Sequence, residues 1–158
     1  MEHKFIKSNE KRDIVKELNE LFGITELPYL LIESGKEKIR AFSGSLSKDE
    51  IIELGKMANV EGVGIYFMKK EDSGLRLSFE ACQLLKAQIT KNILYINDAQ
   101  VELWIRGHDL ELKVAPGTYI IAHGEDFLGC GKSNGDKIFN YVPKERRIKK
   151  PLNQEENK

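Results

Sequence analysis

Residues 124–137 read Gly-Glu-Asp-Phe-Leu-Gly-Cys-Gly-Lys-Ser-Asn-Gly-Asp-Lys, and this glycine-rich stretch decides the fold. Its Gly131-Lys-Ser133 matches the end of a phosphate-binding P-loop. A P-loop needs a glycine five residues before Gly131, where this chain has Asp126, whose carboxylate would repel a phosphate. The dinucleotide pattern G-x-G-x-x-G also fails, because Asn134 occupies the position of its third glycine. We therefore expect these glycines to shape the backbone.

Gly129 and Gly131 flank Cys130 within this stretch. Glycine tolerates the dihedral angles and the close backbone approach that a bend or bulge in a strand requires. Short runs with strand character surround this point. They are expected at residues 110–114, 118–122 and 137–142, with a glycine turn between the last two. Short strands at this spacing predict a small barrel.

The segment before residue 110 alternates strands with short helices. The expected order is a strand at 75–77, a helix from 79 to about 86, a strand at 93–96 and a helix from 99 to 106. Ser78 and Asp98 are placed to cap the two helices, because their side-chain oxygens can accept from N–H groups of the first turn. Gly107 ends the second helix. Cys82 and Trp104 lie on apolar helix faces and are expected in the core.

The first half of the chain has a different order of predicted helices and strands. We expect a helix from about 9 to 22, a strand pair at 29–33 and 37–42, a helix from 47 to 58 and a strand at 60–68. Gly23 supplies the stop for the first helix. Ser47 and Glu50 have the spacing of a capping box at the start of the second. This half therefore predicts a small α+β unit.

A polar, highly charged segment at residues 69–74, Lys-Lys-Glu-Asp-Ser-Gly, is typical of a boundary between domains. We expect an α+β domain at residues 1–72, a second domain at residues 73–150 and a polar tail at residues 151–158. The predicted fold class is α+β.

Composition narrows the class of protein. With 158 residues, of which 41% are hydrophobic, the chain has enough apolar material for a core. It contains no run of 18 apolar residues and no signal-peptide pattern at its start, so we expect a cytoplasmic protein. Cys82 and Cys130 are too few for a disulfide framework or a four-ligand zinc site. We expect no cofactor and no metal.

The formal net charge is zero, but the charges are unevenly placed. Residues 144–150, Lys-Glu-Arg-Arg-Ile-Lys-Lys, hold five cations and one anion. A local cluster of this kind attracts polyphosphate backbones even on a neutral protein. The alternative is a solvated C-terminal tail without a binding role.

The order of motifs in the second half resembles a known family. A strand and a capped helix are followed by Gly107-His-Asp109, by Ala115-Pro-Gly-Thr-Tyr-Ile-Ile121 and by Phe127-Leu-Gly-Cys-Gly131. This order resembles the PUA domain, the small pseudobarrel named for pseudouridine synthases and archaeosine transglycosylases. In that family a helix ends in a glycine-containing loop, and a Leu-Gly-x-Gly strand lies late in the chain. The resemblance covers about residues 75–148 and implies a C-terminal PUA-like β pseudobarrel with short helices.

The segments at both ends of this region indicate which PUA-containing proteins the chain resembles. Leu-Arg-Leu-Ser-Phe-Glu-Ala at 75–81 and Val-Pro-Lys-Glu-Arg-Arg-Ile at 142–148 are similar to the region found with Fmu-type RNA cytosine-5 methyltransferases. They are also similar to stand-alone archaeal proteins and nucleolar ribosome-biogenesis factors that pair a PUA domain with a preceding α+β domain. Residues 1–72 are too short for a cofactor-binding Rossmann-like fold and fit this accessory version. The segment 114–119 is shorter than in many PUA domains, which leaves the strand count open.

The resemblance implies binding of structured RNA. Such modules contact phosphates and sugars, because the major groove of duplex RNA is too narrow for side chains to read. The family's glycine loop and late strand, with the cationic tail, then give the expected RNA-binding residues. They are Arg76, Arg106, Gly107, Lys132, Lys137, Lys144, Arg146, Arg147, Lys149 and Lys150. Arg76 and Arg106 could equally pair with neighbouring carboxylates.

The function expected from these observations is noncatalytic binding of rRNA or tRNA in ribosome biogenesis or RNA modification. The chain shows no nucleophile elbow, metal triad or nucleotide-binding fingerprint, so we expect an accessory protein rather than an enzyme. The alternatives are a protein-interaction adaptor and an RNA-modifying enzyme. A protein partner is expected, if anywhere, at the N-terminal domain.

Overall fold

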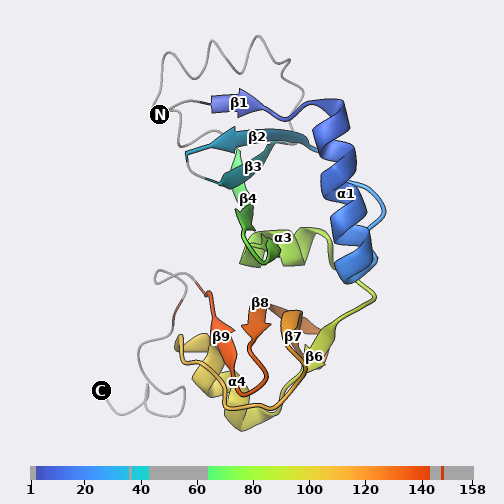
Figure 1. The fold of residues 1–158 in the computed structure, drawn as a ribbon. Helices are drawn as coiled ribbons and strands as arrows, with labels where there is room; N and C mark the ends of the chain where they lie inside the picture. The colour runs from blue at the N-terminus through green and yellow to red at the C-terminus, as the bar shows by residue number, and fades with distance from the viewer. Residues whose placement is uncertain (1–2, 36, 43–63, 143–146, 148–158) are drawn as a thin grey trace, which may run out of the picture.

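The computed structural model describes residues 3–35, 37–42, 64–142 and 147. These residues form a mixed α+β fold, as predicted, and their strands make two β-sheets (Figure 1). The first sheet has the order β1 (His3–Phe5), β2 (Leu30–Ser34), β3 (Lys38–Phe42), β4 (Ile65–Glu71) and β5 (Gly74–Leu77). The second has the order β6 (Ile93–Tyr95), β7 (Gly117–His123), β8 (Asp126–Ser133) and β9 (Ile138–Asn140). The helices are α1 (Ser8–Phe22), α3 (Phe79–Leu84), the short 3₁₀ helix η2 (Lys86–Gln88) and α4 (Asp98–Ile105).

The N-terminal sheet follows the sequence pattern closely. α1 buries Ile14, Leu18 and Phe22 and ends at Gly23, whose φ of 85° is left-handed. β2 and β3 form the predicted antiparallel hairpin. The predicted helix at 47–58 and the start of the predicted strand at 60–68 lie outside the described residues. Among the described residues, no helix combines the length and apolar character that crossing a membrane requires.

A bulge in β4 allows two consecutive residues to enter the core. Ile39 is paired with Met68, whereas the next residue of β3, Arg40, is paired with Tyr66. Phe67 is therefore the extra residue of the bulge, and both Phe67 and Met68 are fully buried. Regular alternation would have sent one of them to the other face of the sheet.

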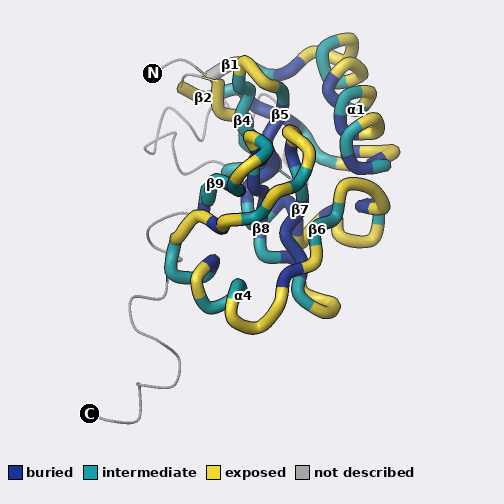
Figure 2. The backbone as a smooth tube through the Cα atoms, turned by 60° about the horizontal axis from the view of Figure 1, so that its bottom comes forward, coloured by how far each residue is buried: buried dark blue, intermediate teal, exposed yellow. Residues whose placement is uncertain are grey.

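The strand β5 joins the two halves of the chain. It was expected to begin the second domain, but it pairs with β4 in the N-terminal sheet. Leu77 at its end belongs to a core cluster that also contains Cys82 on α3 and Ile120 and Cys130 on the second sheet. Figure 2 shows these buried stretches at the centre and α1 at the periphery. The burial of both cysteines is confirmed, and the domain division at residues 72 and 73 stays a prediction.

The second sheet contributes Ile120 and Cys130 to the core cluster through one face, and its opposite face packs on α4. Trp104 is fully buried there, as predicted, and its indole Nε1 donates to the Leu128 carbonyl at 2.8 Å. The predicted cap of α4 was one residue late. Asn97 is the cap, because its side chain accepts from the Gln100 N–H while the Gln100 side chain accepts from the Asn97 N–H. Ser78 caps α3 as predicted, through the Ala81 N–H.

The glycine-rich stretch is mostly a strand. The expected turn is confined to its ends, and residues 126–133 form β8. The pairing of β8 with β7 shifts between Ile120 and Ala122, which is the bulge expected near Gly129. Residues 110–114, expected as a strand, form none; Leu110 makes a single bridge to Ile138. This segment instead packs Leu112 and Val114 against the Trp104 cluster.

Residue 131 has to be glycine because its neighbours leave no room for a side chain. A Cβ atom at this position would lie 2.6 Å from Ile138 Cγ2 and 2.9 Å from the Trp104 ring. Gly131→Ala should therefore lower the free energy of unfolding by about 1–3 kcal/mol, measured by urea unfolding. In an Ile138→Ala background the nearest clash is removed, so the same substitution should cost less. An equal cost in both backgrounds would contradict the packing explanation.

Candidate nucleic-acid interface

The loop after α4 is built by the backbone of one glycine. Gly107 has a φ of 93°, which is left-handed. Its N–H donates to the Trp104 carbonyl at 3.0 Å, and the His108 N–H donates to the Leu103 carbonyl at 3.0 Å. These two bonds form a Schellman motif, which satisfies the last carbonyls of the helix. The predicted role of Gly107 as a helix stop is confirmed, and it leaves the loop exposed at His108.

Asn140 fastens this loop to β9. Its side-chain amide donates to the carbonyls of Trp104 and His108, at 2.8 and 2.9 Å. Its backbone N–H donates to the carboxylate of Asp109 at 2.8 Å. The sequence reasoning missed Asn140, although an asparagine near the end of a strand is suited to bonding nearby backbone groups. The loop is thereby held at a defined position beside β9.

Arg147 lies across the glycine of this loop. Its Nε donates to the Val142 carbonyl at 2.9 Å. A Cβ atom at Gly107 would lie 2.5 Å from both Cδ and Nε of Arg147, so the side chain rests directly on the glycine backbone. Arg106 is the neighbouring residue and is half-buried. The structure thus brings together three of the predicted site residues, Arg106, Gly107 and Arg147.

The outer face of β9 combines cations with aromatic rings. Phe139 and Tyr141 alternate along the chain and are both half-buried. Lys137 Nζ lies 5.4 Å from the centre of the Phe139 ring, within the range of a cation–π contact. Lys132 on β8 is paired directly opposite Phe139. Two more of the predicted residues, Lys132 and Lys137, therefore lie on this face.

Glu71 gathers Arg76 and Lys132 into one cluster. The Arg76 guanidinium donates through Nε and one terminal nitrogen to the two Glu71 oxygens, each at 3.2 Å. Lys132 forms an ion pair with the same carboxylate. Arg76 also lies over the Tyr141 ring, 4.0 Å from its centre, and is only 9% exposed. The predicted role of Arg76 and Lys132 in RNA binding stays a prediction, but both have an acidic partner.

The charge of Glu71 is stabilised by its two partners. Burial acts to raise the pKa of the Glu71 carboxyl, but the hydrogen bonds from Arg76 and Lys132 outweigh it and lower the pKa below its ordinary value. The sequence reasoning missed this residue because it interpreted residues 69–74 as a domain boundary. In the structure, residues 69–71 end β4 and residues 72 and 73 form the tight turn to β5, which places Glu71 beside Arg76.

Comparison with known proteins identifies the C-terminal part of the chain. Residues 91–148 match the family described as the methyltransferase RsmF PUA domain. The C-terminal part is a PUA domain of the RsmF type. The ribosomal RNA small subunit methyltransferase F of Shewanella oneidensis is 30% identical over 95 residues, which are 58% of this chain. The chain spans 20% of the length of that relative.

The match begins just before β6, so the PUA domain contains the whole second sheet and the glycine loop. The predicted resemblance to the Fmu-type family is confirmed, whereas its archaeal part stays a prediction. Four predicted site residues of the basic tail, Lys144, Arg146, Lys149 and Lys150, lie outside the described residues. The six described ones form two neighbouring groups, one at the glycine loop and one on the β8–β9 face.

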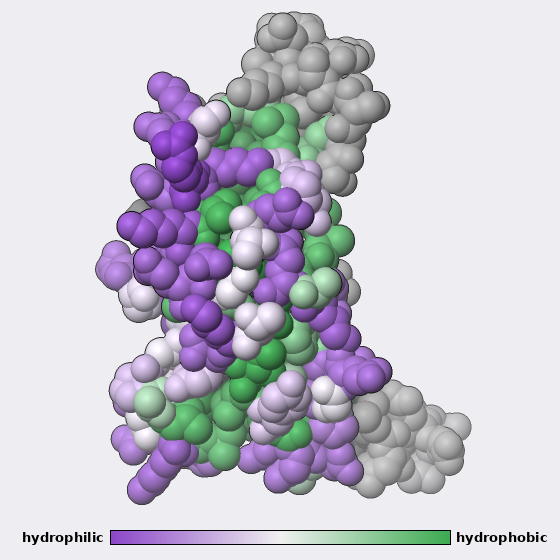
Figure 3. Space-filling model, turned by 90° about the vertical axis from the view of Figure 1, so that its right-hand side faces the viewer, coloured by the Kyte–Doolittle hydropathy of each residue, from purple (hydrophilic) through white to green (hydrophobic). Residues whose placement is uncertain are grey.

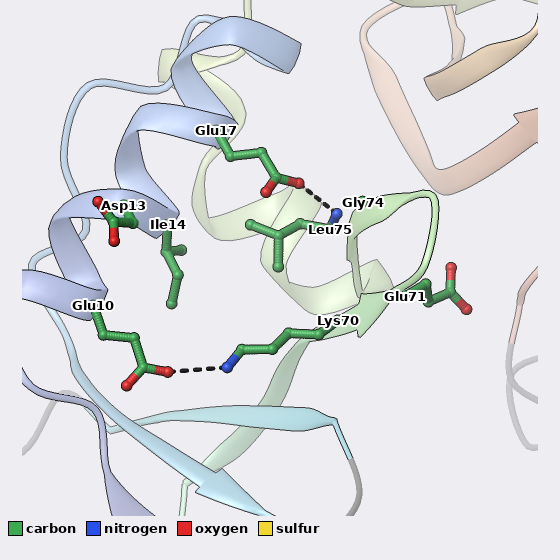
Figure 4. A pocket seen from close by; sticks show the side chains of 8 residues that line it. All are labelled: Glu10, Asp13, Ile14, Glu17, Lys70, Glu71, Gly74 and Leu75. Carbon is green, nitrogen blue, oxygen red and sulfur yellow. Dashed lines mark hydrogen bonds and ion pairs between the residues drawn. The ribbon is translucent and has the colours of Figure 1, made fainter.

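Acidic side chains line a pocket on the side of the N-terminal sheet that carries α1. A pocket of about 320 Å³ between α1 and the β4–β5 turn is lined by Glu10, Asp13 and Glu17, among others (Figure 4). Its cation, Lys70, is bound by Glu10 at 2.9 Å and by Glu33 at 3.2 Å. Figure 3, which faces this side of the molecule, shows hydrophilic and hydrophobic residues interleaved. The carboxylates of this pocket would repel a polyanion that entered it.

The Glu71 cluster generates a pH-dependent prediction. Because the pKa of Glu71 is lowered from 4.5, its charge stabilises the fold above about pH 4.5 and this stabilisation is lost as the pH falls through the folded-state pKa. Glu71→Gln should lower the free energy of unfolding by about 2 kcal/mol at pH 7, measured by urea unfolding. The difference from the parent protein should shrink as the pH is lowered to 3.

Glu20→Gln is the matched control for this experiment, because Glu20 is exposed on α1. It should change the free energy of unfolding by less than about 0.5 kcal/mol at pH 7. A difference between Glu71→Gln and the parent that stays constant from pH 7 to pH 3 would show that the carboxylate charge is not responsible.

Proposed function

We propose that the protein binds structured RNA, either rRNA or tRNA, through its PUA domain and acts in RNA modification or ribosome biogenesis without catalysing a reaction itself. The observation that carries this proposal is the juxtaposition of Arg106, Gly107 and Arg147 at the glycine loop. The similarity to a protein named as a methyltransferase of small-subunit ribosomal RNA supports rRNA as the class of RNA that is bound.

The chemistry of the loop suits the RNA backbone. Gly107 has no side chain, which leaves the room for Arg147 to lie on the loop, and Asn140 keeps the loop in place before any ligand arrives. An arginine guanidinium can donate two parallel hydrogen bonds to one phosphate. Because Arg147 lies on Gly107, its guanidinium is held beside Arg106 and the exposed His108, where it can meet a phosphate.

The noncatalytic role is supported by the extent of the family match. That match covers the PUA domain at residues 91–148, and the described residues before it build a sheet with α1 packed on one face. In the described part of the N-terminal half, no glycine-rich turn joins a strand to a helix, as a Rossmann-like cofactor site would need. The protein would therefore assist an enzyme or an assembly factor.

RNA binding is tested by the salt dependence of affinity. The purified chain should bind ribosomal and transfer RNA more tightly than duplex DNA, measured by fluorescence titration at two or more salt concentrations. Replacing Arg106 and Arg147 with alanine should weaken binding of every RNA. The slope of log K against log salt should become shallower by roughly 1.5, because each lost phosphate contact removes about 0.7–0.9.

A second pair of cations supplies the matched control. Arg12 and Lys16 are exposed on α1, so their replacement with alanine removes the same charge from the other side of the N-terminal sheet. This variant should bind RNA as the parent does. Failure of the parent chain to bind any RNA would overturn the proposal, and turnover of an RNA substrate by the chain alone would overturn its noncatalytic part.

A further inference from the structure

Three cations stand side by side across the N-terminal sheet. Lys38 on β3 is paired with Lys69 on β4, and Lys69 is paired with Arg76 on β5. Neighbouring strands are about 4.8 Å apart, so the backbone positions of the row span about 10 Å. Like charges placed directly opposite each other destabilise a sheet. A row of this kind therefore needs an explanation other than stability.

The row lies on the face of the sheet opposite α1. The neighbouring residues Ile39, Met68 and Leu77, also paired with one another, are fully buried in the core beneath α1. Because side chains alternate between the two faces of a strand, Lys38 and Lys69 point the other way. The pocket lined by Glu10, Asp13 and Glu17 lies on the α1 side of the sheet, away from the row.

Among the described residues, the two lysines of the row have no acidic partner, unlike their neighbours. Lys70, next to Lys69 but on the α1 side, is held by Glu10 and Glu33. Within the described part of the chain, no carboxylate forms an ion pair with Lys38 or Lys69. Lys38 instead lies over the Tyr66 ring, 5.9 Å from its centre. Both ammonium groups are thus placed to accept an external anion.

The row continues onto the PUA domain. Arg76 at its end lies over Tyr141, and Tyr141 follows the β9 face that carries Phe139 and Lys137. Lys132, on the adjoining strand, reaches back to Ser73 in the β4–β5 turn. Cations and aromatic rings therefore form a continuous series from the face of the N-terminal sheet opposite α1 to the β8–β9 face.

We propose that Lys38 and Lys69 form a second RNA contact, so that one RNA backbone runs from the glycine loop over β9 onto the N-terminal sheet. This inference rests on the proposed function and assigns part of the RNA site to the domain before the PUA domain. The ligand is the sugar–phosphate backbone, because flexible lysine ammonium groups act as point charges without base selectivity. Their like-charge repulsion is relieved when phosphates lie between them.

The test uses the full chain with Lys38→Ala and Lys69→Ala combined. Titration with ribosomal RNA over a range of salt concentrations should show weaker binding and a slope shallower by roughly 1.5, since two phosphate contacts are lost. The melting temperature of the free protein should stay the same or rise, because the like-charge pair is removed. The Arg12→Ala and Lys16→Ala double variant is the control, with the affinity and slope of the parent.

The outcomes separate this inference from the proposed function. If the parent binds RNA but the Lys38 and Lys69 variant has the same affinity and slope, the second contact is refuted while the PUA site stands. If the parent binds no RNA, both are refuted. A parallel titration with poly-glutamate tests an acidic protein partner. Binding of poly-glutamate but not RNA, dependent on the two lysines, would also overturn the inference.

Discussion

The close approach of Trp104 to the backbone of β8 at Gly131 determines the geometry of the C-terminal sheet. The indole fills the space that any side chain at residue 131 would occupy, and its Nε1 is bonded to the Leu128 carbonyl. This contact fixes the distance of α4 from the sheet. The end of α4 therefore meets β9 at a defined point, where Asn140 can bond the glycine loop.

The second organising constraint is the distribution of charge about the N-terminal sheet. On the α1 side, Lys70 is compensated by Glu10 and Glu33. On the opposite side, Glu71 compensates Arg76 and Lys132, while Lys38 and Lys69 remain without an acidic partner among the described residues. Glu71 thus links the two sheets as well as limiting the positive charge at their junction. The cations on the two sides therefore differ in whether a carboxylate compensates them.

Much of the local structure could be predicted because it depends on neighbouring residues. The stop of α1 at Gly23, the β2–β3 hairpin and the cap of α3 at Ser78 follow from dihedral preferences and short-range hydrogen bonds. One wrong prediction also concerns local structure, at the start of α4. Asp98 was chosen over Asn97 as the cap of α4, although the Gln100 that completes the capping box was visible in the sequence.

The pairing of distant segments could not be predicted in the same way. Residues 110–114 alternate between apolar and polar side chains as a strand does, yet they form no strand, and Leu110 makes a single bridge to Ile138. The bulge at Phe67 likewise depends on what β3 presents to β4. Such pairings are selected by the whole core, in which residues far apart in the chain are buried together.

By itself, the sequence determined the fold class, the family of the C-terminal part and the glycine that shapes the α4 loop, because short motifs and dihedral preferences act over a few residues. Only the tertiary structure decided which cations have acidic partners. Arg76 and Lys132 resemble Lys38 and Lys69 in the sequence, and the difference is the position of one carboxylate, Glu71. Ion pairing depends on distances of a few ångströms between segments separated along the chain, and those distances exist only once the sheets have packed together.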